Sequence, residues 1–414
     1  QLALALGTGG RDRVASWAVG IAGVLLLTLA VHFAVELSFA GLNALGGLDP
    51  IAPQRFRRVS SDPVRWVTTT TWAVVLALVG CSTLFTRMVL MLVKFGTILP
   101  ALALGTIFLV TLADWSGVET LVNGLEGGPA TGDDATPGRV SGLDEALLSS
   151  RRPDAWLSLA IGLDAVAAVG VVVAWFLADW GATLKTGREL KLTAGIGVGV
   201  ALATSCLLAL AIVALRVSAE GWGRVDGGLE PPTFLRVVWN ERALAAEGWQ
   251  RWALGIAAVT LAAASLGHGV FAAHLGNLGL RRLTPHTPPI RWAWVMGGLA
   301  AFLTLIGLGD RPAWLWLGIA GLVGPLGAVT AVHARGCSFN SLADAPRWRA
   351  TGLIAWALGV VVALLGLTLR VTGGLEGRGD AIPFAILATL STTGVAVLSG
   401  MMVSRFGRSA HSFR

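Results

Sequence analysis

The chain has 414 residues, of which 54% are apolar and only 13% are charged, and its mean hydropathy is +0.71. A soluble fold of this size has no core large enough for that much apolar surface, so the composition indicates a polytopic membrane protein. The net charge of +7 comes mainly from arginines scattered among the polar segments. That scatter argues against a nucleic-acid partner and suits a protein oriented in a lipid bilayer.

Ten apolar runs are long enough to be membrane spans, and we expect all of them to be helices. Lipid tolerates only helices and closed barrels, and these runs show no strand-like alternation. The predicted spans are 14–44, 66–86, 89–113, 154–178, 189–216, 250–274, 291–309, 312–333, 349–371 and 380–404.

The charges of the connecting segments predict the orientation. Three segments that fall on one side are basic, namely 275–291, 334–349 and 405–414. The long segments 114–153 and 217–249 are acidic and fall on the other side. Cytoplasmic loops carry the excess of Lys and Arg, so both termini are expected in the cytoplasm, in a multi-pass protein of the cytoplasmic membrane. Segment 43–65 departs from this rule, because it lies outside and yet carries Arg55, Arg57, Arg58 and Arg65.

Ionisable residues inside the spans are costly and are therefore the first candidates for a functional site. Glu36 follows His32 by one helical turn, so both side chains project from one helix face. A carboxylate beside an imidazole can hold a proton, bind a ligand, or form a purely structural pair. All three roles are open from the sequence.

Four further residues have two interpretations each. Asp164 suits either an outer vestibule or an interfacial acid, and His268 lies between two glycines that suit either a ligand or close helix packing. Gly162 and Gly170 predict a helix that loses regular hydrogen bonding near the membrane midplane, although a glycine in a membrane helix also serves packing.

Catalytic and metal-binding signatures do not support an enzyme. The chain has no HExxH, no Walker loop and no carboxylate cluster that fits a two-metal site. Its histidines lack the ligand spacing for zinc or haem, and Cys81, Cys206 and Cys337 form no CxxC pair. We therefore expect no cofactor and no bound metal.

Several stretches, in order along the chain, together form a recognisable pattern. The strongest is Ala178-Asp179-Trp180, followed by Lys185, Arg188 and the glycine-rich GIGVG at 195–199. The others are KFGTILPALAL at 94–104, HLGNLGLRRLTP at 274–285, and Gly324-Pro325 before His333. These stretches resemble the nucleobase–cation symporter family, which comprises purine, cytosine, hydantoin and allantoin permeases. Phe176, Gly181 and Ala182 depart from the family signature, of which only the Asp-aromatic pair is present.

The resemblance implies a LeuT-like transporter with two inverted repeats of five helices. In this register the ten spans are the family's third to twelfth helices, so the chain is expected to begin inside a longer protein. Residues 1–113 are then the rest of the first repeat, and 114–153 is an external loop. Residues 154–333 form the second repeat, and 349–404 holds two peripheral helices.

The same register implies the site and the activity. Substrate would contact His32, Glu36, Gly170, Val171 and His268, which should converge between the first, fourth and sixth spans. The coupling ion, a proton or sodium, would involve Glu36, Ser265 and Asp164. The implied function is symport of a small nucleobase-like heterocycle across the bilayer by alternating access. Two alternatives are a membrane scaffold that transports nothing and an amino-acid permease of the same fold.

Overall fold

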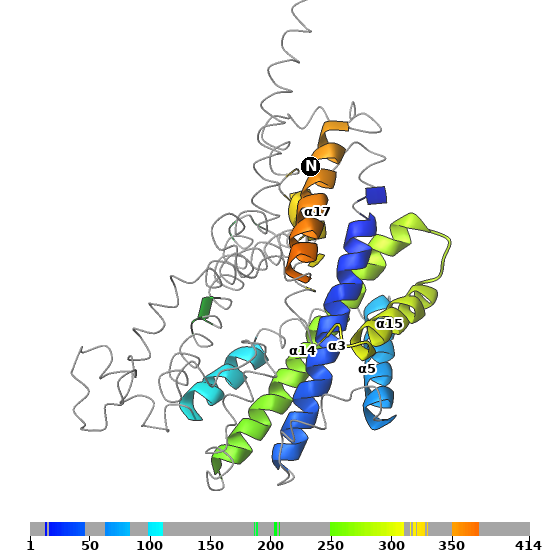
Figure 1. Ribbon diagram of the computed structural model, residues 1–414. Helices are drawn as coiled ribbons and strands as arrows, with labels where there is room; N and C mark the ends of the chain where they lie inside the picture. The colour runs from blue at the N-terminus through cyan, green and yellow to red at the C-terminus, as the bar shows by residue number, and fades with distance from the viewer. Residues whose placement is uncertain are drawn as a thin grey trace, which may run out of the picture.

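The computed structural model is all-helical, with no strand among the residues that it describes (Figure 1). These residues are 13–14, 16–45, 63–82, 98–110, 186, 188, 203–204, 207, 249–309, 315, 318–319, 321–327, 329 and 350–371. Three helical segments are long and apolar enough to cross a membrane, namely Ser16–Phe39, Pro63–Cys81 and Arg251–Leu283. The expectation of an α-helical membrane protein is confirmed at this level.

Two long helices, α3 (Ser16–Leu45) and α14 (Trp249–Leu283), run antiparallel side by side through the middle of the described structure (Figure 1). Glycines allow their backbones to meet. A Cβ atom on Gly23 would lie 2.5 Å from the Cα of Gly276, and one on Gly279 would lie 2.6 Å from the carbonyl oxygen of Ser16. At the other end of the pair, Gly41 meets Gly255. Small residues at such crossings are how membrane helices pack when water supplies no driving force between them.

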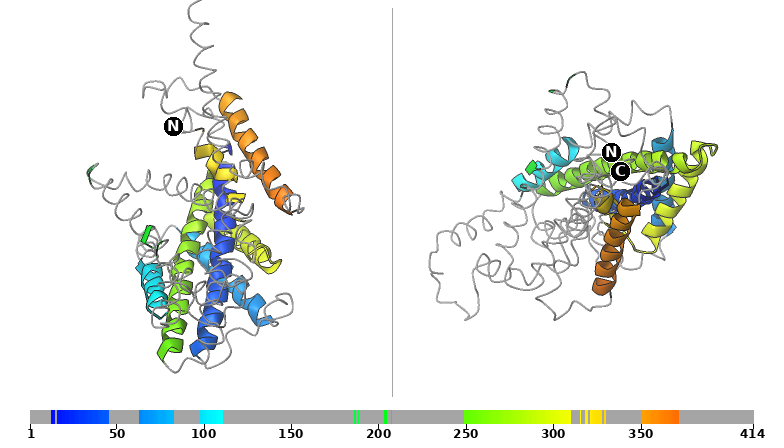
Figure 2. Two further views of the ribbon diagram at one scale, coloured as in Figure 1. Left: turned by 60° about the vertical axis from the view of Figure 1, so that its left-hand side comes forward. Right: turned by 90° about the horizontal axis from the view of Figure 1, so that it is seen from above.

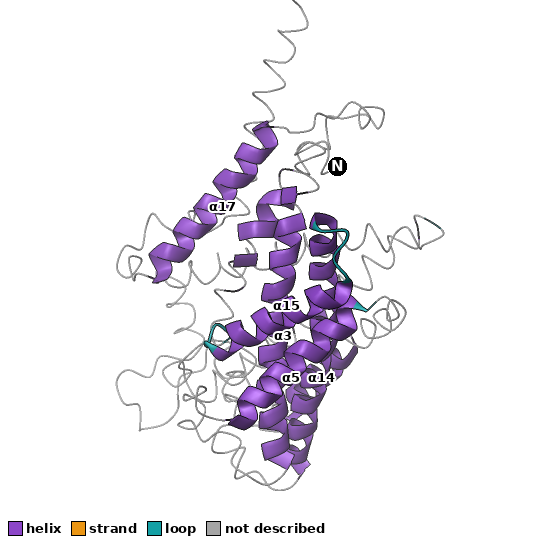
Figure 3. Ribbon diagram, turned by 90° about the vertical axis from the view of Figure 1, so that its right-hand side faces the viewer, coloured by secondary structure: helices purple, strands orange, loops and turns teal. Residues whose placement is uncertain are grey.

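Two shorter helices lie across this pair, α5 (Pro63–Cys81) and α15 (Pro289–Leu305) (Figure 3). Helix α5 packs more extensively on α14 than on α3, which precedes it in the chain. Likewise, α15 packs more extensively on α3 than on α14, which precedes it. Helix α5 meets α14, where a Cβ on Gly80 would lie 2.5 Å from the carbonyl oxygen of Val270. Helix α15 meets α3, and α5 and α15 also meet each other at Gly297. Helices α5 and α15 thus each bridge the two long helices.

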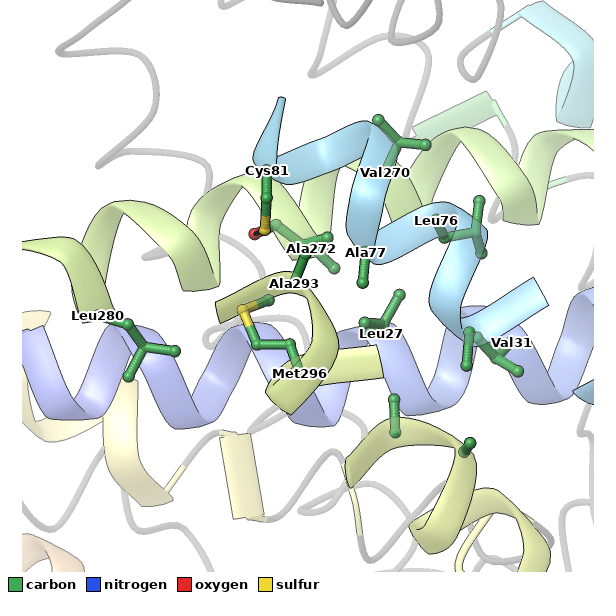
Figure 4. Packing of buried hydrophobic residues seen from close by; sticks show 14 of the residues in the cluster. Leu27, Val31, Leu76, Ala77, Cys81, Val270, Ala272, Leu280, Ala293 and Met296 are labelled. Carbon is green, nitrogen blue, oxygen red and sulfur yellow. Dashed lines mark hydrogen bonds between the residues drawn. The ribbon is translucent and has the colours of Figure 1, made fainter. Parts of the chain in front are cut away.

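The four helices share one core, in which small side chains alternate with a few large ones (Figure 4). Its fully buried large residues include Leu27 and Val31 of α3 and Met296 of α15. Alanines and glycines fill most of the remaining positions, so the helices approach closely and the large side chains fill the gaps between crossings.

Other described segments pack around the edges of this core. Residues 98–110 form an apolar helix against α3 and the N-terminal half of α14. Helix α17 (Ala350–Val371) lies apart from the four-helix core and slants away from it in both views of Figure 2. It contacts the core near its own start, where Ala355 packs with Ala18 and Leu326.

The end of α14 corrects the expectation that residues 275–291 form a loop. Residues 275–283 are not part of a loop, because α14 continues to Leu283 and the connection to α15 is only 284–288. Cationic side chains are favourable in the last turn of a helix, so Arg281 and Arg282 extend α14, and Pro285 then helps to end it. The stretch HLGNLGLRRLTP is therefore mostly helical. The predicted unit boundaries after 113, 153 and 333 and before 349 lie outside the described residues.

Candidate functional site

A stripe of polar residues lies along α3 at four-residue spacing, and it consists of Thr28, His32 and Glu36. This spacing places the three side chains on one helix face, as the sequence predicts for the last two. His32 is only 5% exposed. The stripe is notable because Glu36 is the only acidic residue in the part of the chain that the structure describes.

Glu36 forms an ion pair with Arg65, and the two side chains are 10% and 9% exposed. Arg65 lies in the first turn of α5, which begins at Pro63. A carboxylate or a guanidinium alone in an apolar setting is strongly unfavourable, whereas a close pair satisfies both charges. The ion pair thus joins α3 to α5 near the end of the apolar segment Ser16–Phe39.

The sequence predicts Arg65 in an external loop and gives it no role in the site. The structure corrects this assignment, because Arg65 is helical and buried. A signal was present in the sequence: a buried acid needs a cationic partner, and Arg65 is the first basic residue of the next apolar span. The observation also reduces the charge conflict in segment 43–65, since one of its four arginines is neutralised within the helix bundle.

The imidazole of His32 is covered by the backbone of Gly309. A Cβ atom on Gly309 would lie 2.7 Å from Cγ and 2.8 Å from Nδ1 of His32, so glycine is required for this approach. The chain reaches this point through a turn after α15 in which Gly307 has a φ of 83°, a left-handed conformation that favours glycine. The ring of Phe33 lies 5.5 Å away between ring centroids. The end of α15 therefore covers the middle of the polar stripe.

The first residue of the stripe also meets this part of α15. The hydroxyl of Thr304 donates a hydrogen bond to the carbonyl oxygen of Ala300 at 2.8 Å and lies 3.5 Å from the carbonyl oxygen of Thr28. Thr28 in turn donates to the carbonyl oxygen of Val24 at 2.9 Å. Polar groups of three helices, α3, α5 and α15, thus follow one another along a single line in the membrane-embedded core.

The other predicted site residues fall into two groups. Ser265 and His268 lie on α14, and both bond to carbonyl oxygens of their own helix, Ser265 to Leu261 at 3.0 Å and His268 to Ala264 at 2.8 Å. The ring of His268 is exposed rather than directed into the four-helix core. Asp164, Gly170 and Val171 lie outside the described residues, as does the expected helix break near Gly162. Their convergence with His32 and Glu36 stays a prediction.

Helix α14 carries a second set of polar residues near its C-terminal end. Nδ1 of His274 donates a hydrogen bond to the carbonyl oxygen of Gly80 at 3.2 Å, which satisfies one of the free carbonyls at the end of α5. One turn further along α14, Oδ1 of Asn277 is buried without a hydrogen-bond partner, and Oγ of Ser16 is buried in the same way. Among the described residues, no three His, Cys, Asp or Glu side chains are grouped to hold a metal ion.

Comparisons with known proteins add no relative: no protein-family model, no curated protein and no solved structure matches the chain. The membrane-embedded helices and the paired charges among them therefore carry the functional argument alone.

Proposed function

We propose that the protein is a secondary transporter of the inverted-repeat type, which moves a small heterocyclic, nucleobase-like compound across the bilayer with a proton or sodium ion. The observation that carries this proposal is the buried Glu36–Arg65 ion pair beside His32, among helices that are otherwise apolar. Ionisable groups buried among apolar helices are rare, and in membrane proteins they mark substrate and ion pathways.

The arrangement of the helices supports the same class of protein. In the proposed register, α3 and α5 belong to the first repeat and α14 and α15 to the second. Each short helix packs on the long helix of the other pair, and the two long helices run antiparallel. Repeats of inverted topology, related by a two-fold axis in the membrane plane, are a common architecture of secondary transporters.

The chemistry of the polar stripe suits both roles in symport. Arg65 and His32 offer N–H groups, and Glu36 offers two acceptor oxygens, which together can match the edge of a planar heterocycle. A proton that binds Glu36 removes its negative charge and breaks the ion pair with Arg65. Loading of the coupling proton would thus release α5 from α3, and this release would link ion binding to helix movement.

Uptake into proteoliposomes tests the proposal. Purified protein is reconstituted and given radiolabelled nucleobases, hydantoin, allantoin or an amino-acid mixture, with an inward proton gradient, an inward sodium gradient, or neither. We expect gradient-dependent accumulation of at least one heterocycle. Accumulation of amino acids alone would support the permease alternative, and the absence of any accumulation under all three conditions would support the scaffold.

Variants of the ion pair then test the site. The double variant Glu36→Gln with Arg65→Gln has no titratable carboxylate and leaves no buried charge without a partner. We expect it to lose proton-driven accumulation, with the loss detectable as equal uptake with and without the gradient. Ser265→Ala is the corresponding variant for sodium coupling. Accumulation in the double variant that still follows the proton gradient would exclude Glu36 as the proton carrier.

A further inference from the structure

Four exposed arginines gather at one end of the helix bundle, and we name this region the basic end: Arg13, Arg281, Arg282 and Arg291. Arg281 and Arg282 form the last turn of α14, and Arg291 lies in the first turn of α15. Arg13 precedes α3, whose start meets the end of α14 where Gly279 touches Ser16. Because α3 and α14 are antiparallel, two parts of the chain that are distant in sequence, Arg13 and residues 281–291, bring their positive charges to the same end.

No negative charge balances these arginines among the described residues. Their only acid, Glu36, lies toward the opposite end of α3 and is paired with Arg65. The basic end therefore has a positive potential that only groups outside the described residues can neutralise.

The turn between Arg282 and Arg291 is short, and hydrogen bonds fix its conformation. It spans residues 284–288 and includes Pro285 and Pro288. Nε1 of Trp292 donates a hydrogen bond to the hydroxyl oxygen of Thr284 at 3.1 Å, so that the first turn of α15 is tied back to the end of α14. Within the turn, the backbone N–H of Thr287 donates to the carbonyl oxygen of Thr284 at 3.0 Å. The arginines on both sides are thus presented from fixed backbone positions.

Exposed apolar side chains lie beside the same charges. Ile290 and Trp294 flank Arg291 on α15, and they are 57% and 56% exposed. In a membrane protein such residues face acyl chains, and tryptophan prefers the level of the lipid headgroups. A ligand that satisfies this whole surface has an anionic head for the guanidinium groups and an apolar body for the neighbouring face.

We propose that the basic end binds the headgroup of an anionic phospholipid. Guanidinium groups bind phosphate oxygens through paired hydrogen bonds, and basic side chains next to a membrane helix attract anionic lipids. The structure favours a membrane lipid over a free phosphate because the charged and apolar parts of the surface are contiguous. The proposal depends only on the membrane-embedded helices and is independent of the transport activity.

Native mass spectrometry of the purified protein tests the proposal. The full chain in detergent is mixed with phosphatidylglycerol or with phosphatidylcholine of the same acyl chains, and the retained lipid is counted. We expect the wild type to retain phosphatidylglycerol in preference. The triple variant Arg281→Gln, Arg282→Gln, Arg291→Gln should reduce this preference by roughly tenfold or more, since each arginine near the surface contributes to the attraction.

Two controls separate this effect from damage to the fold. The triple Arg→Lys variant keeps the positive charge and should keep a preference for phosphatidylglycerol. The single variant Arg291→Gln should weaken the preference for phosphatidylglycerol more than Arg251→Gln, which removes one charge near the opposite end of α14. If the triple variant does not fold, this comparison of single variants tests the proposal.

Three results would overturn the proposal. They are equal retention of the two lipids by the wild type, an unchanged preference in the triple glutamine variant, and an equal loss in Arg291→Gln and Arg251→Gln. Inorganic phosphate is added at millimolar concentration in a parallel arm. Displacement of the bound lipid by phosphate would show a site for free anions and would also contradict a phospholipid site.

Discussion

At the scale of single residues, the pairing of Glu36 with Arg65 is what allows either charge to lie in an apolar core. Removal of one member of a buried pair leaves the other charge without a partner, which costs far more than the pair itself contributes. His32 and Thr28 belong to the same stripe; His32 packs against Gly309 in the turn after α15, and the carbonyl oxygen of Thr28 accepts a hydrogen bond from the hydroxyl of Thr304. The stability of this region therefore depends on the balance of two charges more than on any single hydrogen bond.

We predict that Arg65→Gln and Glu36→Gln each destabilise the protein by about 3–5 kcal/mol, because each leaves an isolated buried charge. The double variant should lose less than either single variant, since both remaining side chains are neutral. Thermal unfolding in detergent, followed by fluorescence, gives the order of the three variants. Additive losses in the double variant would show that the two side chains do not stabilise each other.

How much of this site the sequence predicts depends on the range of the interaction. His32 and Glu36 share a helix face because they are four residues apart, which the sequence alone establishes. Their contacts with Arg65 and Gly309 come from other helices, so the choice of partner depends on tertiary packing that no local pattern encodes. His268 shows the converse, because its glycine neighbours suggest a site, while its ring is exposed and bonds to its own helix.

At the scale of helices, glycine positions determine how closely α3, α5, α14 and α15 approach one another. The contact at Gly23 is between backbones, so a methyl group there cannot be accommodated by rotation of a side chain. By contrast, a Cβ on Gly298 of α15 would meet nothing within 4 Å. Two glycines in membrane helices of the same bundle therefore have opposite roles, one in packing and one without a packing partner.

We predict opposite effects of alanine at these two positions. Gly23→Ala should lower the unfolding temperature, because the added Cβ would lie 2.5 Å from the Cα of Gly276 and must force α3 and α14 apart. Gly298→Ala is the matched control and should be neutral or stabilise the protein by up to about 1 kcal/mol, since alanine favours helix more than glycine. Thermal unfolding of both variants in the same detergent is the measurement. A Gly23→Ala variant as stable as the control would contradict the close packing of α3 and α14.

The helices themselves are predicted better than their ends. The expected spans 14–44 and 349–371 correspond closely to α3 and α17, because long apolar runs identify membrane helices directly. Helix α14 ends nine residues beyond the predicted end at 274, because Arg281 and Arg282 continue the helix. Charged residues at a helix C-terminus are compatible with both a loop and a helix, and only the position of Pro285 favours the longer helix.

At the scale of the whole molecule, the described bundle carries more positive charge at one end of its long helices than at the other. The basic end has four exposed arginines, whereas the opposite end has Arg251 and an Arg65 that is neutralised by Glu36. Insertion retains Lys- and Arg-rich segments on the cytoplasmic side, so the asymmetry gives the bundle one preferred orientation.

We predict from this asymmetry that the 284–288 turn lies in the cytoplasm and the end of α3 outside. Single cysteines at His286, which is exposed in the turn, and at Leu42, which is 61% exposed near the end of α3, report the two faces in a variant without the native cysteines. A membrane-impermeant maleimide should label Leu42→Cys in intact cells, and His286→Cys only after the membrane is opened. The reverse pattern would show that the three arginines beside this turn do not set the orientation. The arginines that follow α3, namely Arg55, Arg57 and Arg58, would then be the stronger determinant, because the reverse orientation places them in the cytoplasm.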